Sequence, residues 1–228
     1  MIFTTLRVQE GLPINWKAHQ ERLEDNCKQL NVIFPAISLE EICLFISLKQ
    51  AQKGIWKLKI SITADSYEVT LEPFHDQDQA GWTLSTIKMA RCPQLSKIKS
   101  VSNAENLSLL RKKNTQTNDI CICDEQGYVL ETSIAALFWV VGKTLYYPSL
   151  KLPLLPSTSL KMLRLKSGFK TEECINTISE IPFEAKWYAV NALRGVIPIL
   201  AIDSIAKPVD RNLEAQLQEC LGIKRSIC

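Results

Sequence analysis

Residues 127–138 have the sequence GYVLETSIAALF, which is the most informative stretch of the chain. Gly127 ends a turn, and an apolar strand is expected to run through Glu131 before two further strands at 137–141 and 144–147. A glutamate near a strand end is usually exposed to solvent. The pattern alone therefore leaves open whether Glu131 is a surface residue or part of a site.

Helix and strand signals alternate over the rest of the chain. Polar residues ahead of apolar periodic segments predict where helices begin. The predicted caps are Asn15, Ser38, Ser102 and Asp210, with Glu41 and Glu105 completing capping boxes. Further helix is expected between Pro156 and Gly168, and strands are expected at 3–8, 55–63, 67–73, 82–90, 120–124, 187–190 and 196–202. The helix capped by Ser38 is expected to run to about Gln52.

A polar segment without periodicity, at 74–80, separates two parts of the chain. The first part pairs two helices with a few strands, and the second is rich in strands with inserted helices. This arrangement predicts an α+β protein with a small α/β domain at 1–80 and a larger strand-rich domain at 81–228.

The composition excludes several classes of function. The 27 Lys and Arg residues are scattered among 24 Asp and Glu residues, which leaves a net charge of +3 and no basic block for nucleic acid. No apolar run approaches the roughly 20 residues of a membrane span, and no signal peptide is evident. We expect a cytoplasmic protein. The chain has two histidines, and its eight cysteines form no CxxC pair, so no metal site is predicted. For Cys121 and Cys123, a packing role in the core is favoured over a redox role.

Separated segments form a series of motifs in a fixed order. They are FTTLRV at 3–8 with HQERL at 19–23, IKS at 98–100 followed by Glu105, GYVLETSIAALF at 127–138, LLPSTS at 154–159, and NALRGVIP at 191–198. This series resembles fold-type IV pyridoxal-phosphate enzymes, the aminotransferase class IV, and most of all their aminodeoxychorismate lyases. The resemblance covers nearly the whole chain. It implies a two-domain fold whose larger domain is a pseudo-barrel, a small-molecule substrate and a homodimer.

The resemblance also gives each motif a role toward pyridoxal 5′-phosphate. Lys99 would hold the cofactor through its amine, and Lys97 is the nearby competitor for that role. Arg22 would bind the phosphate with its planar fork, and Glu131 would pair with the pyridine nitrogen and keep it protonated. The remaining cofactor contacts that it implies are Thr158, Ser159 and Asn191.

Within the family, Thr5 favours a lyase, because branched-chain transaminases carry a smaller residue there. The resemblance then implies that 4-amino-4-deoxychorismate is converted to 4-aminobenzoate and pyruvate in folate biosynthesis, with Lys99 as general base and Thr5 helping to move a proton. Two alternatives stay open. A transaminase of branched-chain or D-amino acids would need an arginine for a second carboxylate, and a non-catalytic dimer would only bind. The candidate arginines are Arg7, Arg91 and Arg194.

The chain also departs from the family pattern. Ala136, Ser157 and Leu160 stand where the family usually has Asn, Gly and Arg. A short turn at 63–66 replaces an Arg- and Gly-rich substrate loop, and the chain starts directly at the FTT strand. We expect these changes to remove substrate contacts.

Overall fold

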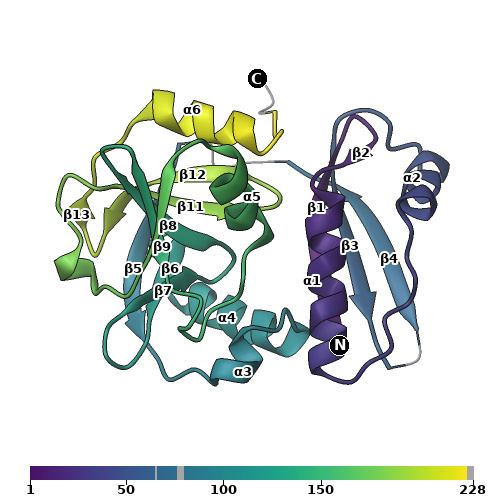
Figure 1. The fold of residues 1–228 in the computed structure, drawn as a ribbon, viewed down its shortest axis with the longest axis horizontal. Coiled ribbons are helices and arrows are strands. Elements are labelled where there is room, and N and C mark those ends of the chain that lie inside the picture. The colour runs from purple at the N-terminus through teal and green to yellow at the C-terminus, as the bar shows by residue number, and fades with distance from the viewer. Residues whose placement is uncertain (65, 76–79, 225–228) are drawn as a thin grey trace.

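The chain forms two sheets that lie side by side, with helix α1 (Trp16–Gln29) on the side of the small sheet that is nearest the larger one (Figure 1). The structure is a computed structural model that describes residues 1–64, 66–75 and 80–224. The predicted linker at 74–80 falls largely on residues 76–79, outside the described residues. The domain boundary at 80/81 therefore stays a prediction.

The small sheet is antiparallel and has the order β2-β1-β3-β4. Its strands are β1 (Ile2–Gln9), β2 (Leu12–Pro13), β3 (Ile55–Ile62) and β4 (Tyr67–Pro73). Successive side chains of a strand point to opposite faces. Leu6 and Val8 of β1 accordingly pack into an apolar cluster with α1 and α2 (Leu39–Leu48), whereas Phe3 and Thr5 face the larger unit. This alternation places Thr5 at a site between the two units.

The larger sheet closes on itself. Its strands are β5 (Trp82–Lys88), β6 (Asp119–Cys123), β7 (Val129–Thr132), β8 (Ala136–Val141), β9 (Thr144–Pro148), β10 (Lys170–Cys174), β11 (Lys186–Asn191), β12 (Gly195–Ile202) and β13 (Ile205–Ala206). The order β8-β11-β12-β5-β6-β7 returns to β8 through the pairing of Glu131 with Ala136. Cys121 and Cys123 pack in the apolar interior beside Trp139 and Trp187. The closed ring confirms the predicted α+β class and the pseudo-barrel.

Helices cover the barrel on two sides (Figure 1). They are α3 (Pro93–Ser96), α4 (Val101–Lys113), α5 (Thr158–Lys166) and α6 (Arg211–Cys220), with a 3₁₀ turn η1 (Ile178–Glu180). Helix α3 and strand β10 were not predicted from the sequence. Among the described residues, no helix has both the length and the apolar character needed to cross a membrane.

Two predicted helix caps are confirmed. The Ser38 hydroxyl accepts from the Glu41 amide at 3.1 Å, and the Glu41 carboxylate accepts from the Ser38 amide at 2.8 Å. Asp210 accepts from the Leu213 amide at 3.0 Å and so caps α6. The helix after Ser38 is shorter than predicted: it ends at Leu48 and not near Gln52.

Two other predicted caps differ from the structure. Asn15 precedes α1 with a positive φ of 54°, and its side-chain amide donates to the Leu221 carbonyl at 3.3 Å instead of capping the helix. Helix α4 starts before Ser102, because the hydroxyl of Ser100 accepts from the Asn103 amide at 3.4 Å. Asn15 therefore occupies the N-cap position without a side-chain cap bond, and Ser100 caps α4 in place of Ser102.

Arg7 of β1 is buried and joins the two units. Its guanidinium donates to the carbonyl of Leu193 at 2.8 Å and to the carbonyl of Lys224 at 2.5 Å. Gln9 accepts from Arg7 at 3.1 Å and from the Lys224 amide at 3.0 Å. The strand that carries Thr5 is thus tied to the Asn191–Arg194 turn and to the end of the described chain.

Replacing Arg7 by Leu should lower the free energy of unfolding by about 2–4 kcal/mol, because two carbonyls of the larger unit lose the charged donor that a buried side chain supplies. Urea denaturation measures the change. Lys112→Leu, at an exposed position of α4, is the matched control and should change stability by no more than about 0.5 kcal/mol. Equal effects of the two substitutions would contradict the bridging role of Arg7.

Candidate active site

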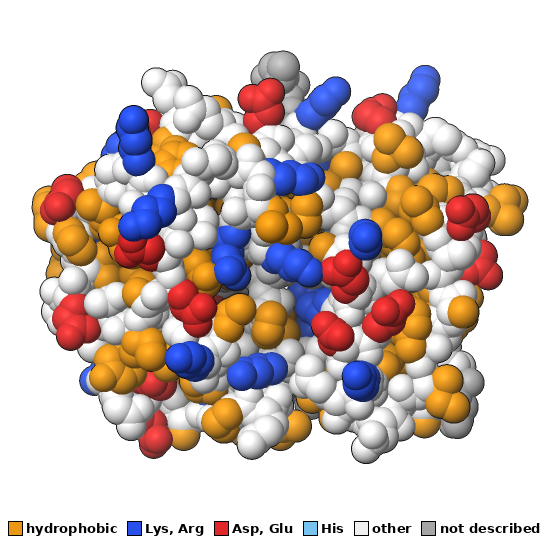
Figure 2. Space-filling model, viewed as in Figure 1, with side chains coloured by type: hydrophobic (Ala, Val, Ile, Leu, Met, Phe, Trp, Pro, Cys, Tyr) orange, Lys and Arg blue, Asp and Glu red, His pale blue; other side chains and the backbone are white. Residues whose placement is uncertain are grey.

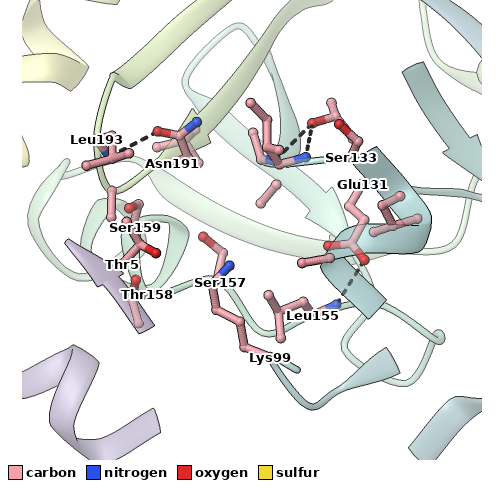
Figure 3. Close-up of a pocket in the computed structure, with 18 of the residues that line it drawn as sticks. Thr5, Lys99, Glu131, Ser133, Leu155, Ser157, Thr158, Ser159, Asn191 and Leu193 are labelled. Carbon is pink, nitrogen blue, oxygen red and sulfur yellow. Dashed lines mark hydrogen bonds between the residues drawn. The ribbon is translucent and has the colours of Figure 1, made fainter. Parts of the chain in front are cut away.

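A cavity of about 320 Å³ lies between the two units. Its walls contain all seven residues that the sequence analysis proposes for the site: Thr5, Arg22, Lys99, Glu131, Thr158, Ser159 and Asn191. Figure 2 shows Lys and Arg side chains along the middle of one face, where the two units meet. Figure 3 shows Lys99 between the Thr5, Thr158 and Ser159 hydroxyls on one side and Glu131 on the other. Residues from separate parts of the sequence thus converge on one cavity.

Lys99 is fixed by its backbone. Its carbonyl accepts from the Phe3 amide at 3.0 Å, and its amide donates to the side chain of Asn26 at 2.9 Å. The Lys99 ammonium lies 4.8 Å from the centre of the Phe3 ring. Lys99 therefore precedes a helix as predicted, although the short helix α3 stands before it instead of a strand. Lys97 lines a different hollow, beside α1 and α5, so the structure separates the two lysines.

Burial lowers the pKa of Lys99 to about 7, and the positive charge of Arg22 acts in the same direction. Glu131 opposes the shift. Because a neutral amine is the nucleophile toward an aldehyde, a lysine with this pKa has a large reactive fraction at neutral pH.

The rate at which the protein incorporates an aldehyde cofactor should depend on this pKa. Below pH 7 the rate should fall about tenfold per pH unit, and above pH 7 it should level off, because Lys99 is then mostly neutral. Stopped-flow measurements of visible absorbance across pH 5–10 check this. A free alkylamine with the same aldehyde is the control, and its rate should continue to rise to about pH 10. A protein profile that also rises to pH 10 would contradict the shifted pKa.

Glu131 lies on β7 at the seam where the barrel closes. Its Oε1 accepts from the Arg91 guanidinium and from the Leu155 amide, the latter at 3.3 Å. Burial raises the pKa of Glu131, while Arg91 and the hydrogen bonds oppose that rise. Both donors bind Oε1, so Oε2 can accept an N–H from a molecule in the cavity.

The three arginines proposed for a substrate carboxylate have different positions. Arg7 binds the Leu193 and Lys224 carbonyls, and Arg91 forms a buried ion pair with Glu131. Of the three, Arg194 lines the cavity. The proposal is therefore wrong for Arg7 and Arg91, because neither residue lines the cavity and each guanidinium binds another group of the protein.

Arg22, Thr158 and Ser159 meet at one end of the cavity. Thr158 and Ser159 are the first residues of α5, whose preceding residue, Ser157, accepts from the Leu160 amide at 3.2 Å. The start of a helix presents unpaired N–H groups and a partial positive charge, which suit an anion. Burial lowers the pKa of Arg22 to about 10, so Arg22 stays positive at neutral pH. Its buried Nε has no hydrogen-bond partner within the described ranges.

Asn191 ends β11 and shapes the turn that follows. Its Oδ1 accepts from the Leu193 amide at 3.0 Å and from the Arg194 amide at 2.9 Å. Figure 3 shows the Asn191 side chain beside Leu193, to which a dashed line joins it. Asn191 lines the cavity, and the contacts of its oxygen hold the turn; its contact with a cofactor stays a prediction.

Sequence reasoning missed several lining residues. Lys57, Asn103 and Arg111 also line the cavity. They lie on β3 and α4, elements that were predicted, but nothing in the sequence indicates which face of each element points into the cavity. His19 belongs to the HQERL motif and lies three residues from Arg22, so the sequence places it on the same helix face as that arginine.

Comparisons with known proteins agree with this geometry. The sequence profile of the family described as Amino-transferase class IV matches residues 1–202. An aminodeoxychorismate lyase from Vibrio harveyi is 23% identical to this chain. The alignment is 232 residues long, and it covers 91% of this chain and 85% of that protein. The structure of 4-amino-4-deoxychorismate lyase from Pseudomonas aeruginosa superposes with a TM-score of 0.79 at 22% identity, covering 96% of this chain and 90% of the other.

A hypothetical aminotransferase from Mycobacterium tuberculosis, with α-ketoglutarate and PMP bound, has the same fold. Its TM-score is 0.83 at 18% identity, with 97% of this chain and 87% of that chain covered. The fold is thus shared by chains named as lyases and as aminotransferases.

Proposed function

The chain belongs to the amino-transferase class IV family, and we propose that it is a pyridoxal-phosphate lyase that converts 4-amino-4-deoxychorismate to 4-aminobenzoate and pyruvate. The observation that carries the proposal is the position of Thr5, which lines the same cavity as Lys99 and Glu131. The family's fold-type IV architecture and its cofactor, pyridoxal 5′-phosphate, are the premise from which the reaction is argued.

The residues of the cavity fit this cofactor. Arg22, with its buried and unpartnered Nε, and the hydroxyls of Thr158 and Ser159 would hold the phosphate. Glu131 would hold the ring nitrogen through Oε2, and Lys99 would bind the aldehyde carbon. When bound, pyridoxal phosphate supplies a protonated ring that accepts the electrons released by a breaking substrate bond. A cavity of about 320 Å³ lies within the range of small-molecule sites.

Lys99 and Thr5 are the groups that would move protons in the reaction. The neutral Lys99 amine would take the proton from the substrate carbon that bears the amino group. The carbon–oxygen bond to the side chain then breaks, the ring becomes aromatic, and the departing group takes up a proton as pyruvate. The Thr5 hydroxyl would pass that proton between Lys99 and the leaving group. Because aromatisation is favourable, the protein needs mainly to orient the substrate.

The substrate of the proposed reaction carries two carboxylates. Cationic side chains from both units line the cavity and would attract them: Lys57, Arg111 and Arg194. Lys57 also pairs with Glu72 on β4. The turn after β3 is short, because the Thr63 amide already donates to the Ser66 carbonyl at 2.9 Å. The three cationic residues would supply substrate contacts in place of the family's longer loop at this position. Asp65 in this turn lies outside the described residues.

An end-product assay tests the proposal. Protein loaded with pyridoxal phosphate is incubated with 4-amino-4-deoxychorismate, and 4-aminobenzoate and pyruvate are expected in equal amounts. Thr5→Val should slow the reaction by about 10²-fold, the lower range for loss of a positioned proton-transfer group. Thr63→Val, at an exposed turn position, should leave the rate unchanged.

Other results favour the alternatives. Keto acid released from branched-chain or D-amino acids, with no 4-aminobenzoate, would identify a transaminase, and Arg194 would then be the residue for the second carboxylate. A protein that takes up no cofactor and forms neither product would be a non-catalytic member of the family. The homodimer and the cytoplasmic location stay predictions.

A further inference from the structure

A buried chain of hydrogen bonds connects α1 of the small unit to α5 of the larger one. Arg22 Nη2 donates to the Thr4 hydroxyl at 2.7 Å, and Thr4 Oγ1 lies 2.8 Å from His19 Nδ1. At the other side of the imidazole, His19 Nε2 lies 3.4 Å from the Thr158 hydroxyl. Thr4, His19 and Thr158 are all buried. The chain thus begins at one proposed phosphate ligand, Arg22, and ends at another, Thr158.

The chemistry of the first member sets the direction of the whole chain. A guanidinium has donors only, so the Thr4 oxygen must accept from Arg22. The single Thr4 proton then points to the nearest acceptor, His19 Nδ1. This arrangement leaves the ring proton of a neutral imidazole on Nε2, where it donates to the Thr158 oxygen. The Thr158 hydroxyl proton is then directed into the cavity.

The opposite arrangement has a different outcome at the far end. If His19 carried its proton on Nδ1, Nε2 would be an acceptor, and the Thr158 proton would point to the histidine. A phosphate dianion offers only acceptors, so Thr158 could then give it no hydrogen bond. One proton position on His19 therefore decides whether Thr158 can donate to an anion.

The environment keeps the imidazole neutral, as the directed chain requires. Burial holds the pKa of His19 well below its usual range, and the charges of Arg22 and Lys99 lower it further. Glu131 is the acidic group at the cavity, and its carboxylate is paired with Arg91. A second proton on His19 would remove the acceptor that Thr4 needs.

We infer that His19 is a positioning residue, fixed as the Nε2–H tautomer, that orients the Thr158 hydroxyl as a donor to the phosphate group of the cofactor. The inference rests on the proposed placement of the phosphate, and it holds for a lyase and a transaminase alike. Each bond in such a chain polarises the next, so the charge of Arg22 also strengthens the Thr158 donor. The small unit thereby takes part in phosphate binding at a helix that belongs to the larger unit.

Nitrogen-15 NMR of the cofactor-free protein tests the tautomer directly. The chain contains two histidines, and His75 is exposed, so the signals of His19 can be assigned against an internal reference. At pH 7 we expect a neutral His19 ring with a proton on Nε2 and an unprotonated Nδ1. A proton on Nδ1, or a charged ring, would overturn the inference whatever the cofactor does.

Binding measurements test the consequence for the phosphate. Thr4→Val keeps the side-chain shape and removes the link between Arg22 and His19. The substitution should weaken the binding of pyridoxal phosphate by about tenfold. It should leave the affinity for pyridoxal, which lacks the phosphate, unchanged. Thr4→Ser retains the hydroxyl and should restore wild-type affinity. The role of the hydrogen-bond chain would be contradicted if Thr4→Val weakened the binding of both ligands equally, or if it weakened the binding of neither.

The same titration separates this inference from the proposed function. If the wild-type protein binds pyridoxal phosphate no more tightly than pyridoxal, the proposed phosphate site fails. The tautomer measured by NMR still decides the direction of the chain in that case. If the wild type prefers the phosphate and Thr4→Val retains the full preference, the positioning role of His19 fails and the cofactor site stands.

Discussion

Replacing Lys99 by Ala should reduce turnover of 4-amino-4-deoxychorismate by at least about 10³-fold, because one residue supplies both the covalent attachment and the general base. The visible absorbance of bound pyridoxal phosphate should be lost as well. Since Lys99 lies in the cavity with a pKa lowered to about 7, no exposed lysine can replace it at neutral pH. Steady-state assays and absorbance spectra of the purified variant measure both effects.

Lys97→Ala is the matched control, because Lys97 lies two residues away and lines a different hollow. Its turnover and its spectrum should stay close to those of the wild type. The assignment of Lys99 would be wrong if Lys97→Ala lost the visible absorbance or if Lys99→Ala kept it.

Glu131→Gln should have the second largest effect, on both stability and chemistry. A neutral amide leaves the buried Arg91 without its counter-charge, which should lower the free energy of unfolding by about 3–5 kcal/mol. It also cannot hold a proton on the cofactor ring nitrogen, so kcat should fall by about 10²–10³-fold. Urea denaturation of the cofactor-free protein and kcat of the loaded protein measure the two effects separately.

The double variant Glu131→Gln with Arg91→Gln distinguishes the two roles. Replacing both members of a buried pair by neutral groups should recover most of the lost stability, because no unpaired charge remains. The loss in kcat should persist. If the double variant regained both stability and kcat, the effect of Glu131 on turnover would be purely structural.

The seven residues proposed for the site from the sequence all line one cavity, and each of them belongs to a local motif. Lys99 lies ahead of a helix, Glu131 lies on a short strand, and Thr158 opens a helix after Ser157. These are features of a few consecutive residues, and the order of the motifs along the chain fixed the family. The convergence on one cavity follows from the family fold and could not be inferred from strand or helix periodicity alone.

The contacts that connect the motifs were not predictable in the same way. Arg91 was proposed for a substrate carboxylate, but it pairs with Glu131, which is 40 residues away in sequence. Arg7 reaches Lys224 across 217 residues. Such partners depend on how the two sheets pack, and the local sequence carries no record of that packing.

Local patterns also failed where two residues compete for one role. Ser102 with Glu105 matches a capping box, yet Ser100 caps α4, because the backbone before it pairs with β1 through Phe3 and Lys99. Asn15 stands at the N-cap of α1, but its backbone is left-handed with a φ of 54°, and its side chain makes no cap hydrogen bond. Tertiary hydrogen bonds decided the outcome at Ser100, and the local backbone conformation accompanies the outcome at Asn15.

The most direct test of the account is the identity of the residue that holds pyridoxal phosphate. Borohydride reduction of the loaded protein makes the cofactor linkage permanent, and mass spectrometry of the digested protein locates it. The account predicts one cofactor per chain, attached to Lys99, with none on Lys97. Attachment to Lys97 or to any other lysine, or no attachment at all, would contradict it.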